Sequence, residues 1–307
     1  MDELVTVVSL SYRKFEEIFK TIQSVLIQNY SRIEYIISDD GSENFPEEEI
    51  RQFVHANKKN NLENFLIIKN KKNIGTVRNI NHAYEMARGD ILMPLSVGDE
   101  FFSRDVVSRV VKDFDENSER EVLMVRRAVL DENGYVISVV PSDHEVKQIK
   151  KWDTARKQYN AYVTNRAYGY LSGCTLYMRK SFFLEWGGFD EKYRLLEDAP
   201  FFAQYMWRKK IYLDESIVGI RYGAGGVSYG KKKHPLLLAD DDLFNQTDRV
   251  SHIEELDAVT RSALLLNLER NKAKVEGDNK YKRVRDYIRH PLGGIAFVKY
   301  HLSQKGV

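Results

Sequence analysis

The amino-acid sequence predicts an α/β protein with a mostly parallel sheet that is flanked by helices. Three observations lead to this fold class. Apolar runs typical of buried strands alternate with segments in which apolar residues recur at helical spacing, and turn residues separate them. A chain that alternates strands and helices in this way forms a parallel sheet with helices on both faces.

The first hundred residues carry the clearest alternation. Strands are expected at LVTVVSLSY, EYIIS, NFLIIKN and DILMPLS, which occupy residues 4–12, 34–38, 64–70 and 90–96. Helices are expected over 15–26, after Pro46 where three glutamates favour a first turn, over 76–89 with a stop at Gly89, and from about Ser103. Each strand is thus followed by a helix.

The rest of the chain is less regular. VLDENGYVI predicts a hairpin that turns at Asn133 and Gly134, whereas residues 146–169 have no clear pattern. A strand, a short helix and a glycine turn follow, then a helix over 198–210 and a strand over 211–215. From about residue 236 the chain is expected to be helical, so we divide it into a domain of residues 1–235 and a helical, basic extension of residues 236–307.

The composition excludes several classes of protein. The 307 residues carry a net charge of +2, which gives no reason to expect a nucleic-acid partner, and the single cysteine excludes an intrachain disulfide framework or thiolate zinc cluster. The first residues lack the pattern of a signal peptide, and no run is long enough to span a bilayer. We therefore expect a cytoplasmic protein.

A ligand site is expected where the parallel strands end. The turns there are LSYRK, SDDGS and LSVGDE, and ligands of such sheets bind at the carboxyl ends of strands. Two of these turns are acidic, and acids alone would repel a phosphate. A divalent cation is a natural bridge between such acids and a phosphate group.

Four spaced segments resemble the family-two glycosyltransferases, which have the GT-A fold. They are VTVVSLSYRK with the helix ending SVLIQNY, YIISDDGS, NIGTVRNINHAYEMARGDILMPLSVGDEF, and SGCTLYMRKSFFLEWGGFDEKYRLLEDAPFF. Together they span roughly residues 5 to 230. The resemblance implies transfer of a sugar from a nucleotide sugar to an acceptor hydroxyl, with inversion at the anomeric carbon.

The resemblance also implies a nucleotide site at the first three segments. Asp40 matches the aspartate that bonds the nucleotide base, although it could instead bond its own turn, and Arg78 matches an arginine near the nucleotide, although it could be a solvated helix residue. The other residues expected at the nucleotide are Leu10, Ser11, Tyr12, Gly98 and Asp99.

The fourth segment supplies the expected reacting groups. Asp198 matches the general base that takes the proton of the acceptor, and Glu197, Trp186 and Gly173 are expected at the donor or acceptor sugar. An acidic pair at a helix start could also serve only as a cap, because the helix dipole favours carboxylates there. Burial among aromatic residues would raise the pKa of such a base and strengthen it.

The metal is expected to be Mg²⁺ or Mn²⁺, with Asp99 as its ligand. The acidic motif of the family is reduced here to this single aspartate, which could also merely cap a helix, and Gly223 stands where many members have a metal-binding histidine. His234 lies further on and is a weaker candidate ligand.

The predicted function is therefore an inverting transfer of one sugar, from a UDP-sugar, to a glycan or lipid-linked acceptor in the synthesis of a bacterial surface polysaccharide. Two alternatives stay open. One is a catalytically inactive binding module with the same fold, and the other is a sugar nucleotidyltransferase. The basic, aromatic end of the chain predicts peripheral contact with the inner face of a membrane, or a solvated or dimer-forming helical pair.

Overall fold

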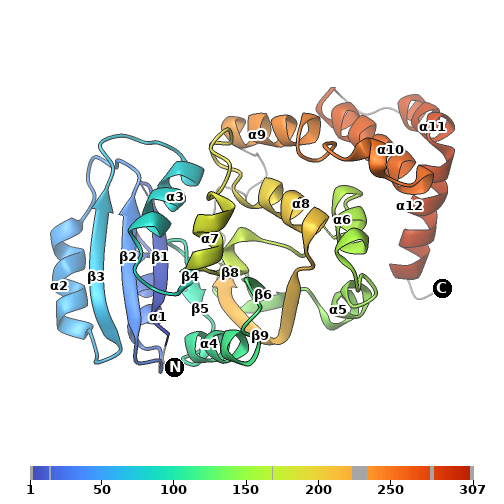
Figure 1. Ribbon diagram of the computed structural model, residues 1–307. Helices are drawn as coiled ribbons and strands as arrows, with labels where there is room; N and C mark the ends of the chain where they lie inside the picture. Colours follow the sequence, from blue (N-terminus) through green and yellow to red (C-terminus); the bar gives the residue numbers. More distant parts are fainter. Residues whose placement is uncertain (1–2, 14, 168, 223–233, 277–279, 305–307) are drawn as a thin grey trace.

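The computed structural model describes residues 3–13, 15–167, 169–222, 234–276 and 280–304 (Figure 1). The strands are β1 Val5–Ser11, β2 Ile33–Asp39, β3 Leu62–Lys69, β4 Ile91–Pro94, β5 Glu100–Phe101, β6 Val122–Leu130, β7 Val136–Val140, β8 Leu176–Arg179 and β9 Tyr212–Tyr222. The α-helices are α1 Ile18–Leu26, α2 Glu47–Asn57, α3 Thr76–Met86, α4 Val106–Glu116, α5 Asp143–Ile149, α6 Ala155–Val163, α7 Lys180–Trp186, α8 Asp198–Arg208, α9 Pro235–Gln246, α10 Ala258–Glu276, α11 Lys280–Arg289 and α12 Pro291–Gln304. Two short 3₁₀ turns, η1 and η2, occupy Gly173–Thr175 and Ile253–Glu255.

Within the described residues, nine strands form one sheet. Eight follow the order β3-β2-β1-β4-β8-β6-β9-β5, and β7 pairs with β6. Strands β3, β2, β1 and β4 run parallel to one another, β8 is antiparallel to both β4 and β6, and β9 is parallel to β6. The predicted α/β class, with helices that flank the sheet, is confirmed.

The parallel pairing of β1 with β2 and β4 positions the site. Ser11 at the end of β1 is level with Asp39 at the end of β2, and Val8 is level with Pro94 at the end of β4. The turns that follow these three strands therefore meet at one edge of the sheet.

Helices cover both faces of the sheet (Figure 1). One apolar core lies under α1, α2 and α4, and the other lies under α3, α6, α7 and α8. In β1 the side chains of Val5 and Val7 enter the first core, whereas Val8 enters the second. The near-continuous apolar run of this strand is explained by burial on both faces.

Helices α9 and α10 pack onto the second core, and α11 and α12 pack against α10. Leu237 and Phe244 of α9 and Leu264 of α10 are buried in the same cluster as α6 and α8. The buried guanidinium of Arg249 donates hydrogen bonds to the Val163 carbonyl at 2.7 and 2.9 Å and to the Asn165 side chain at 2.7 Å. The division of the chain at residue 235 stays a prediction. No helix in the described ranges is long and apolar enough to cross a membrane.

The end of α3 corrects one expectation. The helix ends at Met86, three residues before the predicted stop at Gly89, and its C-cap Ala87 has φ −59° and ψ 145°. Gly89 lies against β1, where a Cβ atom would come within 2.5 Å of the Thr6 nitrogen. Close packing, and not a left-handed helix cap, is therefore the reason for this glycine.

Residues 146–169, which the sequence pattern left unassigned, contain the end of α5 and all of α6. Helix α5 begins with a capping box: the Ser142 hydroxyl accepts a hydrogen bond from the Glu145 N–H at 3.3 Å, and the Glu145 carboxylate accepts one from the Ser142 N–H at 2.7 Å. Thr154 caps α6 through the N–H of Lys157. The S-x-x-E spacing is a helix-start pattern that could have revealed α5.

Candidate active site

Strand β1 ends between two polar turns. The Ser11 carbonyl accepts a hydrogen bond from the Asp40 N–H at 2.9 Å, and the Leu10 carbonyl accepts one from the Val97 N–H at 3.2 Å. The Ser11 side chain is buried, and its hydroxyl has no hydrogen-bond partner among the described residues. Because a buried polar group without a partner is destabilising, a ligand that bonds to this hydroxyl would relieve that cost.

Asp40 ties the turn after β2 to the start of α3. Its carboxylate accepts hydrogen bonds from the N–H groups of Ile74 and Gly75 at 2.8 and 2.9 Å, and from the Asn70 side-chain amide at 3.2 Å. Its neighbour Asp39 accepts bonds from the N–H and hydroxyl of a single residue, Ser42, and so closes the turn itself. Asp40 thus has a structural role, and its contact with a nucleotide base stays a prediction.

Tyr12 lies on an unusual piece of backbone. Its side chain is 40% exposed, and the guanidinium of Arg13 lies 5.0 Å from its ring centroid. Arg13 has φ 59°, a left-handed conformation that is uncommon for a residue other than glycine. Its N–H donates to the Ser42 hydroxyl at 3.0 Å, which holds this loop against the turn after β2.

Thr21 of α1 organises the turn that carries Asp99. Its hydroxyl donates to the Asp99 carbonyl at 2.8 Å and accepts a hydrogen bond from the Gly98 N–H at 3.1 Å. Gly98 has φ +101°, a backbone conformation that favours glycine. A Cβ atom there would meet nothing within 4 Å, so the conformation, and not a lack of space, explains this glycine. The Asp99 side chain is buried beside the end of β4.

Glu197 and Asp198 lie where α8 begins. Asp198 is the first residue of the helix, and its carboxylate accepts a hydrogen bond from the Gly173 N–H at 2.8 Å. A Cβ atom on Gly173 would lie 2.7 Å from a carboxylate oxygen of Glu197 and 3.2 Å from Cβ of Asp198. The structure therefore brings Gly173 into direct contact with the acidic pair.

Burial raises the pKa of both carboxyl groups. For Glu197, burial and then the charge of Asp198 raise the pKa to about 8. Burial also raises the pKa of Asp198, but the N–H groups of Gly173 and Ala199 and the charge of Arg127 oppose that rise. Two adjacent carboxylates do not both ionise readily, so near neutral pH the pair keeps one proton. The backbone donors place the negative charge on Asp198.

The charges of both Asp198 and Asp99 act on the thiol of Cys174. Burial raises the pKa of its thiol to about 12, and the charges of both Asp99 and Asp198 add to the rise. The same two carboxylates raise the pKa of the Tyr222 phenol, for which burial is again the main cause. The pKa values of Cys174 and Tyr222 thus both depend on the charges of Asp99 and Asp198.

Arg127 of β6 is a cation of this region that the sequence patterns did not single out. Its charge lowers the pKa values of Asp198 and Cys174, which opposes the effect of burial. One guanidinium nitrogen donates to the Gly169 carbonyl at 3.2 Å, and the other, Nη1, is buried without a partner among the described residues. A pair of arginines in the middle of an otherwise apolar strand was the signal that could have identified it.

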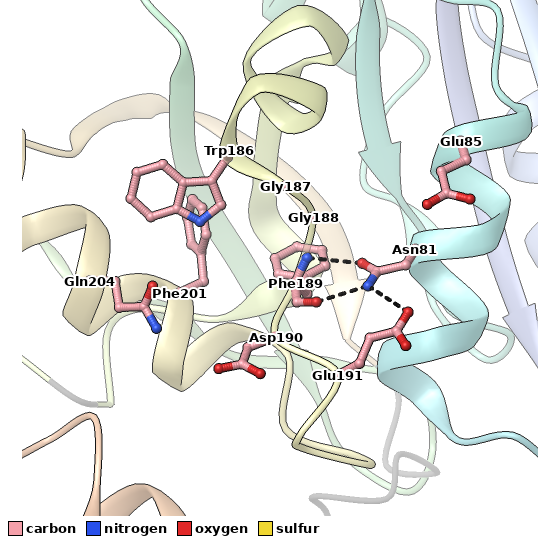
Figure 2. Close-up of a pocket in the computed structure, with 10 residues that line it drawn as sticks. All are labelled: Asn81, Glu85, Trp186, Gly187, Gly188, Phe189, Asp190, Glu191, Phe201 and Gln204. Atoms are coloured by element: carbon pink, nitrogen blue, oxygen red, sulfur yellow. Dashed lines mark hydrogen bonds between the residues drawn. The ribbon is translucent and has the colours of Figure 1, made fainter.

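A hollow of about 410 Å³ lies between α3, α7 and α8 (Figure 2). Trp186 and Phe201 line it, with 5.7 Å between their ring centroids. The Asn81 amide fixes one wall, since it donates to the Phe189 carbonyl at 2.8 Å and accepts from the Phe189 N–H at 2.9 Å. Trp186 thus belongs to this hollow, whereas Gly173 and Glu197 lie together at the start of α8.

Arg78 lies beside the same hollow. Its Nε is 3.2 Å from a carboxylate oxygen of Glu191, and both side chains are more than half exposed. Glu191 lines the hollow in Figure 2. The contact of Arg78 with a nucleotide stays a prediction.

A family model described as glycosyl transferase family 2 matches residues 6–183, which is more than half of the chain. The chain belongs to glycosyl transferase family 2. The matched segment includes Ser11, Asp40, Asp99 and Gly173, whereas the acidic pair lies beyond its end. The predicted family is therefore confirmed.

Similar proteins agree with this assignment. A glycosyltransferase of Methanocaldococcus jannaschii, itself described as uncharacterized, is 28% identical over 152 residues, which are 48% of this chain and 50% of that protein. The chain thus spans about half the length of this curated relative.

Solved structures of glycosyltransferases share the fold. Residues 1–349 of TarS from S. aureus, in complex with UDP-GlcNAc, give a TM-score of 0.61 at 13% identity over 92% of this chain and 79% of that one. A longer TarS structure gives 0.56 at 15% identity over 87% of this chain, but only 43% of its own length is covered. The mannosyltransferase PcManGT from Pyrobaculum calidifontis, in complex with GDP-Man and Mn²⁺, gives 0.51 at 13% identity over 99% of this chain and 81% of that one.

The predicted metal ligands of this chain are few. The described residues hold no group of three or more His, Cys, Asp or Glu side chains that could bind a metal ion. His234 is exposed and caps α9, where its Nδ1 accepts a hydrogen bond from the Leu236 N–H at 3.2 Å, and Gly223 lies outside the described residues. The role of Asp99 as a ligand of Mg²⁺ or Mn²⁺ stays a prediction.

Proposed function

We propose that the protein is an inverting glycosyltransferase that moves one sugar from a nucleotide sugar, with a UDP-sugar as the expected donor, to an acceptor hydroxyl. The observation that carries the proposal is the acidic pair at the start of α8. Near neutral pH this pair keeps one proton, and Asp198 holds the negative charge against the Gly173 N–H. A partly buried carboxylate with a raised pKa is suited to accept a proton from a hydroxyl.

Asp198 acts as the general base in this proposal. It takes the proton from the acceptor oxygen as that oxygen bonds to the anomeric carbon of the donor, and the bond from that carbon to the diphosphate breaks. Glu197, which keeps its proton below pH 8, can donate a hydrogen bond to a sugar hydroxyl. Gly173 lets both acids lie directly against the backbone, because any larger residue would meet the carboxylates.

The nucleotide occupies the edge formed by the turns after β1, β2 and β4. The Ser11 hydroxyl, which has no partner among the described residues, supports this placement, because a ribose or base could bond to it. TarS and PcManGT, which share the fold, were solved with nucleotide sugars. Asp99 would hold an Mg²⁺ or Mn²⁺ ion, which when bound supplies positive charge to the departing diphosphate. Arg127 is a fixed positive charge of the protein in the same region.

The acceptor belongs to a surface polysaccharide or a related glycan in this proposal, and the C-terminal helices bring the enzyme to a membrane. The helix α12 exposes an apolar row, Leu292, Ile295, Val298 and Leu302, together with Lys299. Apolar and basic side chains on one helix suit the surface of an anionic bilayer. Failure to sediment with anionic lipid vesicles would remove this part of the proposal.

The release of nucleoside diphosphate tests the reaction. The wild-type protein is incubated with a set of nucleotide sugars and acceptor glycans, with and without Mn²⁺, and its melting temperature is recorded with each donor. A true donor stabilises the folded protein by mass action. In Asp198→Asn, we expect donor binding to persist while turnover falls by about 10²–10⁴-fold, the usual contribution of a general base.

Exposed Asp242 supplies a matched control, because Asp242→Asn makes the same chemical change on α9. Wild-type turnover in Asp198→Asn would remove the proposed base. Stabilisation by donors without any turnover would instead favour the inactive binding module, and a product that retains the nucleotide would favour the nucleotidyltransferase.

A further inference from the structure

The segment just before the acidic pair is held by a single carboxylate. The N–H groups of Arg194, Leu195 and Leu196 all point to one oxygen of Asp240, at 2.9, 2.6 and 3.2 Å. Three consecutive N–H groups that converge on one acceptor fix the backbone of the segment closely. Glu197 follows at once, so the position of Asp240 determines how the chain enters α8.

Asp240 comes from α9, far along the chain from the strands that form the site. Its side chain is buried, and α9 is itself anchored through Leu237 and Phe244 in the core under α8. Hydrogen bonds from N–H groups to an ionised carboxylate are about twice as strong as neutral ones. A helix of the C-terminal part thus supplies a rigid, charged support for the loop that carries the acids.

The same segment touches the proposed nucleotide side. The Arg194 carbonyl accepts a hydrogen bond from the Val77 N–H at 3.2 Å, and the Arg194 guanidinium donates to the Asn73 side chain at 2.8 Å. A Cβ atom on Gly75 would lie 2.6 Å from the Arg194 carbonyl oxygen. Because Asp40 holds the N–H of Gly75, one series of backbone contacts runs from Asp40 through Arg194 to Asp240.

Asp240 also acts on the acidic pair through its charge. Three titratable groups interact with Glu197: Asp198 beside it, Asp240 from α9, and Tyr84 from α3. After burial and Asp198, the charge of Asp240 raises the pKa of Glu197 further. A change at Asp240 should therefore alter the titration of the pair as well as its position.

We infer that Asp240 is a positioning residue for glycosyl transfer, which holds the Arg194–Leu196 backbone so that Glu197 and Asp198 face the acceptor. The inference rests on the proposed role of the acidic pair. It assigns α9 to the catalytic unit, because the site is incomplete without the carboxylate that this helix supplies.

Asp240→Asn tests the inference with the side-chain volume unchanged. The amide oxygen of asparagine can still accept a hydrogen bond, but the negative charge is lost. The NH₂ group that replaces the other carboxylate oxygen cannot accept a hydrogen bond. We expect kcat to fall about 10- to 100-fold, the cost of a small displacement of a reacting group, with a smaller change in the KM for the donor. Asp242→Asn, the same change at an exposed position two residues later, should keep the wild-type kcat.

The pH profile separates positioning from simple loss of structure. In the wild type, the dependence of kcat/KM on pH should show an inflection near the Glu197 pKa of about 8, and Glu197→Gln should remove it. Because the negative charge of Asp240 raises that pKa, the inflection should move to lower pH in Asp240→Asn. It should stay in place in Asp242→Asn.

Amide hydrogen exchange makes the inference independent of the reaction. The N–H groups of Arg194, Leu195 and Leu196 should exchange faster in Asp240→Asn than in the wild type or in Asp242→Asn. Faster exchange in a protein that transfers no sugar would support the positioning contact and reject the proposed function. Unchanged exchange, or a wild-type kcat with an unmoved pH inflection, would overturn the inference. A far-UV spectrum and a melting temperature close to those of the wild type show that the variant is folded. If Asp240→Asn does not fold, Asp240→Glu, which keeps the charge, replaces it. This second variant must restore both the fold and the pH inflection, or the inference fails.

Discussion

Two of the pairs of consecutive acids in this molecule, Asp39–Asp40 and Glu197–Asp198, differ in the hydrogen bonds around them. Asp39 and Asp40 follow β2 and accept bonds from backbone N–H groups and from the side chains of Ser42 and Asn70. Glu197 and Asp198 begin α8, and burial raises the pKa of both. Donors to both oxygens make each acid of the first pair part of the scaffold. At the second pair burial outweighs the backbone donors and raises the pKa of both acids.

Replacement of Asp40 gives the largest effect that this comparison predicts. Asp40→Ala leaves the N–H groups of Ile74 and Gly75 without their acceptor, and each buried donor without a partner costs about 1–3 kcal/mol. We expect the free energy of unfolding, measured with denaturant and without any nucleotide, to fall by about 3–5 kcal/mol. Glu43→Ala, which removes an exposed acid three residues later, should change it little. A variant as stable as the wild type would show that Asp40 is only a ligand-binding residue.

The second prediction concerns the space beside the reactive pair. In Gly173→Ala the new methyl group would lie 2.7 Å from a Glu197 oxygen and must displace the acids. We expect kcat to fall about 10- to 100-fold, because the reacting carboxylate moves, while the binding of nucleotide at the other pair persists. Steady-state kinetics and nucleotide titration measure the two effects separately.

Gly169→Ala is the matched control, since a Cβ atom there meets nothing within 4 Å. Equal kcat values for the two alanine variants would mean that Gly173 does not limit the position of the pair. An equal loss of nucleotide affinity and of kcat in Gly173→Ala would also weaken the distinction between the two acidic pairs.

The sequence correctly predicted the elements that a single local pattern identifies. The buried run of β1, the helical spacing of Val106, Val110 and Phe114 in α4, and the Asn133–Gly134 hairpin turn each follow from local pattern, and all are present. The order of segments shared with the family placed Gly173 at the sugar, whereas its contact with the acidic pair came only from the structure. Local pattern fails at Gly89, because a glycine at a helix end and a glycine under a neighbouring strand look the same in sequence.

Roles that depend on long-range contacts could not be predicted in this way. The support that Asp240 gives to residues 194–196 joins positions more than forty residues apart. An acid in LADDDLF looks like any exposed helix acid until the fold buries it. Arg127 was overlooked for the same reason, since its charge matters only because α8 brings Asp198 near it.

The smallest predicted effect is on stability as a function of pH. The pKa of Glu197 is about 8 in the folded protein and near 4.5 in an unfolded chain. Between these values the folded state keeps a proton that the unfolded state has lost, so rising pH lowers the free energy of unfolding until about pH 8. Glu197→Gln removes this group. Above pH 8 the free energy of unfolding of the variant should therefore exceed that of the wild type by on the order of 2 kcal/mol. Near pH 4.5 this difference should vanish. Urea unfolding at both pH values measures it, with exposed Glu185→Gln as the control. If Glu197→Gln were equally destabilising at both pH values, its carboxyl group would be a scaffold acid like Asp39 and Asp40, and the contrast between the two pairs would be lost.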